Sequence, residues 1–206
     1  MEVIKLTQAN IQDIAAQAAS VLRSGGVILY PTDTLYGLGA DAFSDEAVAK
    51  VYAIKGRDEK KPIHCVVADL AAAANYLEMN DAAMELGKKF LPGPLTLVLK
   101  KRSEVNSGIA KHIDTIGVRV PYNDFCLSLA KEFGPYTTTS ANVAGGANMR
   151  TIDQIVEQLG ERAAMIDLVI DAGELPEQKP STVVDVSSGS VQVLREGAIP
   201  SAKILE

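Results

Sequence analysis

The densest group of cationic side chains in this sequence lies in the segment KGRDEKKP, residues 55–62. Lys55, Arg57, Lys60 and Lys61 place four cations within seven residues. If the chain is extended here, Lys55 and Arg57 project in related directions and could reach one polyphosphate. An arginine can hold phosphate oxygens with two parallel hydrogen bonds. The alternative is a solvated run of charges at a helix C-terminus, where cations are favoured.

A segment rich in hydroxyl groups, PTDTLYGLG, spans residues 31–39 and follows a predicted strand. Its glycines would let a ligand approach the backbone closely, and its polar side chains could hydrogen-bond that ligand. These side chains are Thr32, Asp33, Thr34 and Tyr36. An ordinary loop between a strand and a helix is the alternative interpretation.

A second polar segment, TTTSANVAGG, covers residues 137–146. Ser140 and Asn142 could contact a phosphate or an adenosine, and backbone N–H groups beside glycines can form an anion-binding nest. A polar surface loop is the alternative. Because Thr137 to Thr139 are compatible with a half-buried strand, a purely surface role is the less favoured interpretation.

Arg119 lies inside the predicted strand of the segment TIGVRVP, residues 115–121. A buried arginine needs a partner, because an unpaired buried charge is costly, and a substrate carboxylate or phosphate would serve. Alternation along a strand also allows the opposite arrangement, with Val118 and Val120 in the core and Arg119 in solvent. The spacing leaves both interpretations open.

Two weaker candidates come near the C-terminus, where Ser181 and Thr182 begin a predicted strand and Arg195 ends another. The sequence contains no GxxxxGK[ST] phosphate loop, no GxSxG nucleophile elbow and no HExxH zinc motif. No Ser-His or Cys-His nucleophile pair stands out. This pattern favours chemistry by positioning and charge neutralisation over covalent catalysis.

The elements that must position these residues alternate between strand and helix, which is typical of an α/β domain. Strands are predicted for residues 3–6, 27–30, 63–67, 95–99, 116–120, 168–170, 182–186 and 191–194. Helices are predicted for residues 11–22, 45–55, 81–90 and 123–133, and from Thr151 onward, where Gln154 completes a capping-box pattern. The polar segments fall at strand ends, where open α/β sheets bind ligands. At 206 residues, one domain spanning residues 1–206 is expected.

Composition narrows the class of protein. With 47% apolar residues and a net charge of −6, the chain is expected to be an ordinary globular protein without tight, general nucleic-acid binding. A local pocket can still be basic. The two cysteines and two histidines form no metal-ligand spacing, so the cysteines are expected to be buried free thiols. No apolar run is long enough for a membrane span or a secretory signal, so a cytoplasmic location is expected.

Taken together and in order, seven motifs resemble the threonylcarbamoyl-AMP synthase family, whose catalytic unit is the YrdC-like domain. The resemblance runs from about residue 6 to residue 197. The motifs are PTDTLYGLGADAF, KGRDEKKP, FLPGPLTLVLKK, DTIGVRVP, TTTSANVAGG, PSTVVDV and LREG.

The resemblance implies a twisted, mixed parallel and antiparallel α/β sheet with flanking helices and a positively lined groove, in a single-domain form. It implies an enzyme that makes threonylcarbamoyl-AMP and pyrophosphate from L-threonine, bicarbonate and ATP, with Mg²⁺ on the phosphates. The product would pass to a downstream tRNA threonylcarbamoyl transferase.

The resemblance also implies roles for individual residues, none of them a covalent nucleophile. The implied ATP contacts are Lys55, Arg57, Lys61, Thr115, Ser140, Asn142, Asn148 and Arg195. The implied threonine contacts are Thr34, Arg119, Thr138 and Ser181.

One position departs from the family pattern. Some members carry a histidine that contacts threonine where this chain has Val66, and His64 lies two residues earlier, on the same face of a predicted strand. His64 could replace that histidine or simply be a packed strand residue. Two other functions stay open, a YciO-like paralogue with weak or altered activity and an RNA-binding module. The 5% aromatic content argues against the module, because stacking platforms need aromatic side chains.

Overall fold

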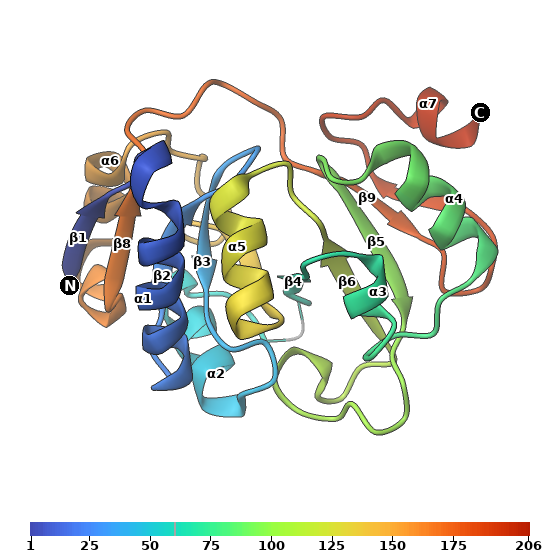
Figure 1. The fold of residues 1–206 in the computed structure, drawn as a ribbon, viewed down its shortest axis with the longest axis horizontal. Coiled ribbons are helices and arrows are strands. Elements are labelled where there is room, and N and C mark those ends of the chain that lie inside the picture. The colour runs from blue at the N-terminus through green and yellow to red at the C-terminus, as the bar shows by residue number, and fades with distance from the viewer. Residues whose placement is uncertain (60) are drawn as a thin grey trace.

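The computed structural model describes residues 1–59 and 61–206, which form one ten-stranded sheet with helices packed around it (Figure 1). The strands are β1 (Glu2–Lys5), β2 (Ile28–Pro31), β3 (Tyr36–Gly39), β4 (His64–Val66), β5 (Leu95–Lys100), β6 (Thr115–Arg119), β7 (Tyr136–Ser140), β8 (Leu168–Asp171), β9 (Thr182–Asp185) and β10 (Gln192–Arg195). The α-helices are α1 (Ile11–Arg23), α2 (Asp45–Lys55), α3 (Leu70–Ala73), α4 (Asp81–Phe90), α5 (Asp124–Phe133), α6 (Ile152–Leu159) and α7 (Ser201–Leu205). Three short 3₁₀ helices are η1 (Gln8–Asn10), η2 (Gly108–Ala110) and η3 (Gly160–Met165).

The strand order across the sheet is β1-β8-β2-β3-β7-β4-β6-β5-β9-β10. Four neighbouring pairs are parallel (β1 with β8, β8 with β2, β4 with β6, β5 with β9) and the others are antiparallel, so the sheet is mixed, as predicted. The centre of the sheet is β3-β7-β4, all antiparallel. This order brings the ends of β3, β7, β4 and β6 together although they come from distant parts of the chain.

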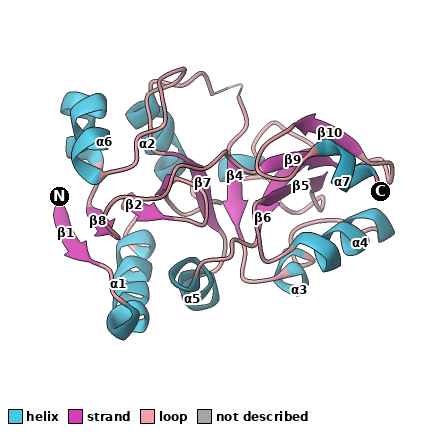
Figure 2. Ribbon diagram, turned by 90° about the horizontal axis from the view of Figure 1, so that it is seen from above, coloured by secondary structure: helices cyan, strands magenta, loops and turns pink. Residues whose placement is uncertain are grey.

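Helices lie on both sides of the sheet, with α1 and α5 on one side and α2 and α6 on the other (Figure 2). The buried positions of α1 include Ile14, Ala18 and Leu22, which are spaced by four residues and therefore form one apolar stripe. Together with Phe125 and Leu129 of α5 they form a core cluster against β2, β7 and β8. This cluster fixes one face of the central strands.

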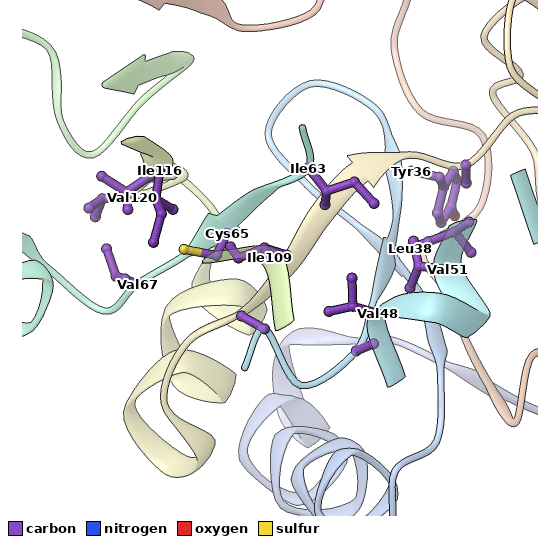
Figure 3. Packing of buried hydrophobic residues seen from close by; sticks show 14 of the residues in the cluster. Tyr36, Leu38, Val48, Val51, Ile63, Cys65, Val67, Ile109, Ile116 and Val120 are labelled. Atoms are coloured by element: carbon purple, nitrogen blue, oxygen red, sulfur yellow. The ribbon is translucent and has the colours of Figure 1, made fainter. Parts of the chain in front are cut away.

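The larger core cluster lies on the opposite face of the central strands (Figure 3). Cys65 of β4 and Leu38 of β3 point into it, together with Val48 and Val51 of α2. The burial of α2 is relevant to the site, because this helix ends at Lys55, just before the cationic segment.

Most of the predicted elements are confirmed, and the Thr151 hydroxyl caps α6 by accepting a hydrogen bond from the Gln154 N–H. The predicted loop at residues 31–39 is partly wrong, because Tyr36–Gly39 forms the buried strand β3. Cys65 and Cys126 are buried free thiols, as predicted. In the described ranges, no helix has both the length and the apolar character needed to cross a lipid bilayer.

Candidate functional site

A pocket of about 360 Å³ opens where the central strands meet the loops after β2, α2 and β7. Its side chains come from segments that are far apart in the sequence. They include Thr32, Thr34, Arg57, His64, Arg119, Thr138, Ser140, Asn148, Ser181 and Arg195.

The pocket occupies one part of a sheet face whose other part is covered by helices. On β4 and β7, Val66 is paired with Tyr136, and both side chains are buried in the cluster with α1 and α5. The next pair on the same face is His64 with Thr138, and both residues line the pocket. The pocket therefore begins where the helical cover of this face ends.

Arg119 is buried at the end of β6 and pairs with a carboxylate. Its Nη2 lies 2.6 Å from Asp33 Oδ1 and donates a longer hydrogen bond of 3.3 Å to Thr34 Oγ1. The other Asp33 oxygen accepts from the Tyr122 N–H at 3.1 Å. Both charged side chains are only 8% exposed. Of the two arrangements that alternation allowed, the structure shows the buried arginine, and Asp33 holds it in place.

The cationic segment is not extended at its start, which corrects the geometry assumed for Lys55 and Arg57. Lys55 is the last residue of α2, and Gly56 follows with a positive φ of 57°, a conformation that favours glycine. The two side chains therefore diverge. Arg57 lines the pocket and donates from Nη2 to the Pro62 carbonyl at 3.1 Å.

Lys55 lies beneath the pocket and holds the segment at residues 140–146. Its ammonium donates to the Ser140 carbonyl, to the Asn142 carbonyl at 3.0 Å and to Asn142 Oδ1 at 3.1 Å. The Ser140 hydroxyl lies 2.5 Å from the same Oδ1, and Asn142 Nδ2 donates to the Gly146 carbonyl at 2.7 Å. Burial and the charge of Arg57 lower the pKa of Lys55 to about 8. All three ammonium hydrogens are used, so Lys55 positions Ser140 and Asn142 and has none left for a ligand.

On the other side of the pocket, Arg195 and Ser181 form a second group. Arg195 Nη2 donates to the Ser181 carbonyl at 2.8 Å and reaches the Ser181 hydroxyl at 3.3 Å. That hydroxyl lies 2.8 Å from the buried Thr96 hydroxyl on β5. Burial, followed by the charges of Arg119 and Arg57, lowers the pKa of Arg195. Arg57, Arg119 and Arg195 therefore lie close enough in the pocket for their charges to influence one another.

Asp33 balances the charge of Arg119, but the pocket lining as a whole is cationic. Arg57, Arg119 and Arg195 line the pocket, whereas no aspartate or glutamate does among the described residues. The Nε atoms of Arg57 and Arg119 are buried and have no hydrogen-bond partner in the described part of the chain. Buried charged donors without acceptors are costly, so this arrangement fits an anionic ligand.

His64 lies on the pocket floor beside these arginines, directly over Gly117 of the neighbouring strand β6. A Cβ atom at position 117 would lie 2.5 Å from His64 Cδ2, so only glycine leaves room for the imidazole. Burial and the charges of Arg195, Arg119 and Arg57 lower the pKa of His64 to about 4. The ring is therefore neutral at physiological pH.

Eight of the twelve predicted contacts line the pocket, and four do not. The eight are Thr34, Arg57, Arg119, Thr138, Ser140, Asn148, Ser181 and Arg195. Lys55 and Asn142 support the pocket from below. Lys61 is exposed, and Thr115 lies at the far end of β6 from Arg119. Lys60, which belongs to the same cationic segment, falls outside the described residues.

The sequence did not identify the supporting roles of Asp33, Thr96 and Gly117. Asp33 was expected to face a ligand, but it pairs with Arg119, from which it is separated by 86 residues in the chain. A carboxylate in one predicted loop and an arginine inside a predicted strand were the available signals. Gly117 gave no local signal, because its role depends on His64 in a neighbouring strand.

Comparison with known proteins identifies the family of the chain. The profile of the Sua5/YciO/YrdC family, described as telomere recombination, matches residues 20–197. The chain belongs to this family. Members of the Sua5/YciO/YrdC family similar to it include a provisionally named threonylcarbamoyl-AMP synthase of Methanocaldococcus jannaschii, 39% identical over 181 residues. That match covers 88% of this chain and 84% of the relative.

Two solved structures of Sua5/YciO/YrdC proteins resemble the fold closely. Pyrococcus abyssi Sua5 complexed with L-threonine superposes with a TM-score of 0.90 at 31% identity, covering 99% of this chain. This chain spans only 60% of the length of that protein. Escherichia coli YciO superposes with a TM-score of 0.81 at 30% identity, covering 97% of this chain and 96% of YciO.

Proposed function

We propose that this chain is an L-threonylcarbamoyladenylate synthase, a nucleotidyltransferase that makes threonylcarbamoyl-AMP and pyrophosphate from L-threonine, bicarbonate and ATP. The observation that carries the proposal is the pocket with three arginines, no lining carboxylate among the described residues and two buried, unpartnered guanidinium Nε atoms. The reaction brings together a carboxylate, a carbamate and a triphosphate, so it needs such a pocket. The shared family and the relatives named above support the same activity.

In this proposal threonine binds at the Arg119 end of the pocket. Its carboxylate pairs with Arg119, whose Nε lacks a partner in the described chain, while Asp33 keeps the guanidinium in place. The hydroxyl groups of Thr34, Thr138 and Ser181 offer hydrogen bonds to the polar groups of the amino acid. All four predicted threonine contacts line the pocket.

ATP binds at the side of the pocket formed by Arg57, Ser140, Asn148 and Arg195. Arg57 and Arg195 neutralise the phosphates, and Lys55 acts indirectly by holding Ser140 and Asn142. Lys61 and Thr115 remain predicted ATP contacts outside the pocket lining. Mg²⁺ enters the site bound to the phosphates of the nucleotide. The described residues contain no cluster of three or more His, Cys, Asp or Glu side chains that could hold the ion.

The chemistry proceeds without a covalent enzyme intermediate. The threonine amine first becomes a carbamate with bicarbonate, and a carbamate oxygen then attacks the α-phosphorus of ATP. The new P–O bond forms as the bond to pyrophosphate breaks. The guanidinium groups of Arg57 and Arg195 stabilise the charge that develops on the phosphates. They need little reorganisation, because the carbonyls of Pro62 and Ser181 already hold them.

The wider role follows from the product. A mixed anhydride hydrolyses in water, so it must pass to a second enzyme, a tRNA threonylcarbamoyl transferase, in the cytoplasm. The chain itself is expected to bind RNA weakly, in keeping with its net charge of −6.

The direct test is to incubate the protein with ATP, Mg²⁺, bicarbonate and L-threonine and to identify the product by mass spectrometry. The proposal predicts a species with the mass of threonylcarbamoyl-AMP. Replacing L-threonine with L-valine is the matched control, because valine is similar in shape but lacks the hydroxyl group. Protein that binds ATP and threonine but forms no such product would contradict the proposal.

A further inference from the structure

His64 occupies the boundary between the two halves of the proposed substrate site. It is paired across strands with Thr138, a predicted threonine contact, and Ser140, a predicted ATP contact, lies two residues further along β7 on the same face. The strand β6 places Gly117 beneath the imidazole and Arg119 two residues beyond. The carbamate must form between the amino acid and the α-phosphate, which is where His64 lies.

His64 is also the only imidazole among the described side chains of the pocket, and its neutral ring has a nitrogen that can accept a proton. The charged groups facing it are Arg57 after α2, Arg119 on β6 and Arg195 on β10, all permanently protonated. Asp33 is held by Arg119 and by the Tyr122 N–H. The imidazole makes no hydrogen bond to another described residue, so it keeps a free lone pair.

We propose that His64 accepts the proton that the threonine ammonium group gives up when the carbamate forms. This inference rests on the proposed function and names the general base for its first step. The base must be neutral before the reaction, and burial, followed by the charges of Arg195, Arg119 and Arg57, keeps His64 in that state.

The step balances in atoms and charge. Threonine binds with a protonated amine, and one proton moves from its nitrogen to His64, which becomes an imidazolium. The free amine attacks the bicarbonate carbon, and the new N–C bond forms as hydroxide leaves with a second amine proton as water. His64 returns its proton to solvent after the products leave.

The arginines that help to keep His64 neutral also connect its basicity to substrate binding. When phosphates neutralise Arg57 and Arg195, the repulsion that disfavours the imidazolium falls, so the pKa of His64 rises by the part of its shift that those two charges cause. His64 thus becomes a better proton acceptor only when the nucleotide is in place.

This linkage is measurable without turnover. The chain has two histidines, so NMR of histidine-labelled protein gives two imidazole titrations, and the variant His112→Asn identifies the signal of His64. Asparagine suits position 112, where φ is 62°. Saturation with pyrophosphate is expected to raise the proton affinity of His64 about tenfold or more. An unchanged titration with pyrophosphate bound would overturn the inference.

Activity provides the second test. His64→Gln keeps a polar side chain but cannot take up a proton, and we expect kcat to fall about 100-fold with the KM for ATP nearly unchanged. The fall in wild-type rate at acid pH should disappear in this variant. His64→Ala should be rescued by added imidazole, which can occupy the space over Gly117, whereas His112→Asn should match the wild type.

A His64→Gln variant with wild-type kcat and pH profile would overturn the role of His64 and leave the proposed function intact. Wild-type protein that forms no threonylcarbamoyl-AMP would instead overturn the proposed function, and the proposed role of His64 with it.

Discussion

Replacing Lys55 with methionine tests whether this lysine positions the pocket or contacts the nucleotide. Methionine keeps most of the apolar stem and removes the ammonium group. The carbonyls of Ser140 and Asn142 would lose a charged donor, at a cost of about 1–3 kcal/mol each and about 2–6 kcal/mol together. This is the unfavourable part of the change.

The favourable part is relief from burying a charge. Lowering the pKa of Lys55 from 10.5 to about 8 corresponds to about 3 kcal/mol, at roughly 1.4 kcal/mol for each pKa unit. Subtracting about 3 kcal/mol from about 2–6 kcal/mol leaves a net change between a gain of about 1 kcal/mol and a loss of about 3 kcal/mol. For a chain of this size a loss of about 3 kcal/mol lowers Tm by about 6–12 °C, and the variant should fold.

Function should suffer more than stability. Without the ammonium group, Ser140 and Asn142 are no longer held in place, and a displacement of about 1 Å can reduce the rate about 100-fold. We therefore expect kcat/KM for ATP to fall by that factor while amide hydrogen exchange at residues 140–148 increases. The matched control is Lys50→Met on the same helix, whose ammonium donates only to the Gly25 carbonyl at the surface.

Two outcomes would refute this reasoning. Wild-type kcat/KM in Lys55→Met would mean that the lysine is not needed to hold the segment. Loss of ATP affinity with unchanged hydrogen exchange at residues 140–148 would mean that the ammonium contacts the nucleotide directly.

Three further predictions concern the pocket lining. Arg119→Ala should weaken threonine binding by about 2–4 kcal/mol, which raises the threonine concentration needed for half-maximal rate roughly 30- to 900-fold and has little effect on the KM for ATP. Unchanged threonine dependence would rule out the proposed carboxylate contact. Arg57→Ala should weaken ATP binding measured by calorimetry about 10-fold or more, whereas Arg23→Ala, which breaks an exposed ion pair, should leave it unchanged. Gly117→Ala should displace the His64 imidazole, so kcat should fall while ATP affinity is retained, and full activity would show that the contact over Gly117 is unimportant.

The helices and strands were predicted well where their signals lie within a few neighbouring residues. The helix at residues 45–55 was predicted with its observed bounds. In the structure both ends are set locally, by the Ser44 side-chain cap and by Gly56 with its positive φ. Strand β3 was missed because its sequence, YGLG, contains two glycines, which normally weaken strands. In the structure both glycines lie against the ring of Tyr30, and a Cβ atom at position 39 would also lie 2.9 Å from Ile28. That contact is long-range and leaves no local pattern.

The site was predicted in part for the same reason. Hydroxyl and cationic residues at strand ends pointed to the correct segments, and eight of the predicted contacts line one pocket. The sequence did not show that Arg119 would be buried, because its partner Asp33 lies in a different segment. It also did not show that Lys55 faces away from Arg57, since this depends on the turn that Gly56 makes at the end of α2.

The central claim is tested most directly by measuring pyrophosphate release from ATP with L-threonine and bicarbonate present together, with each omitted in turn, and with both omitted. We expect release only when ATP, L-threonine and bicarbonate are all present. Pyrophosphate release that does not need threonine, or no release from protein that binds ATP, would contradict it.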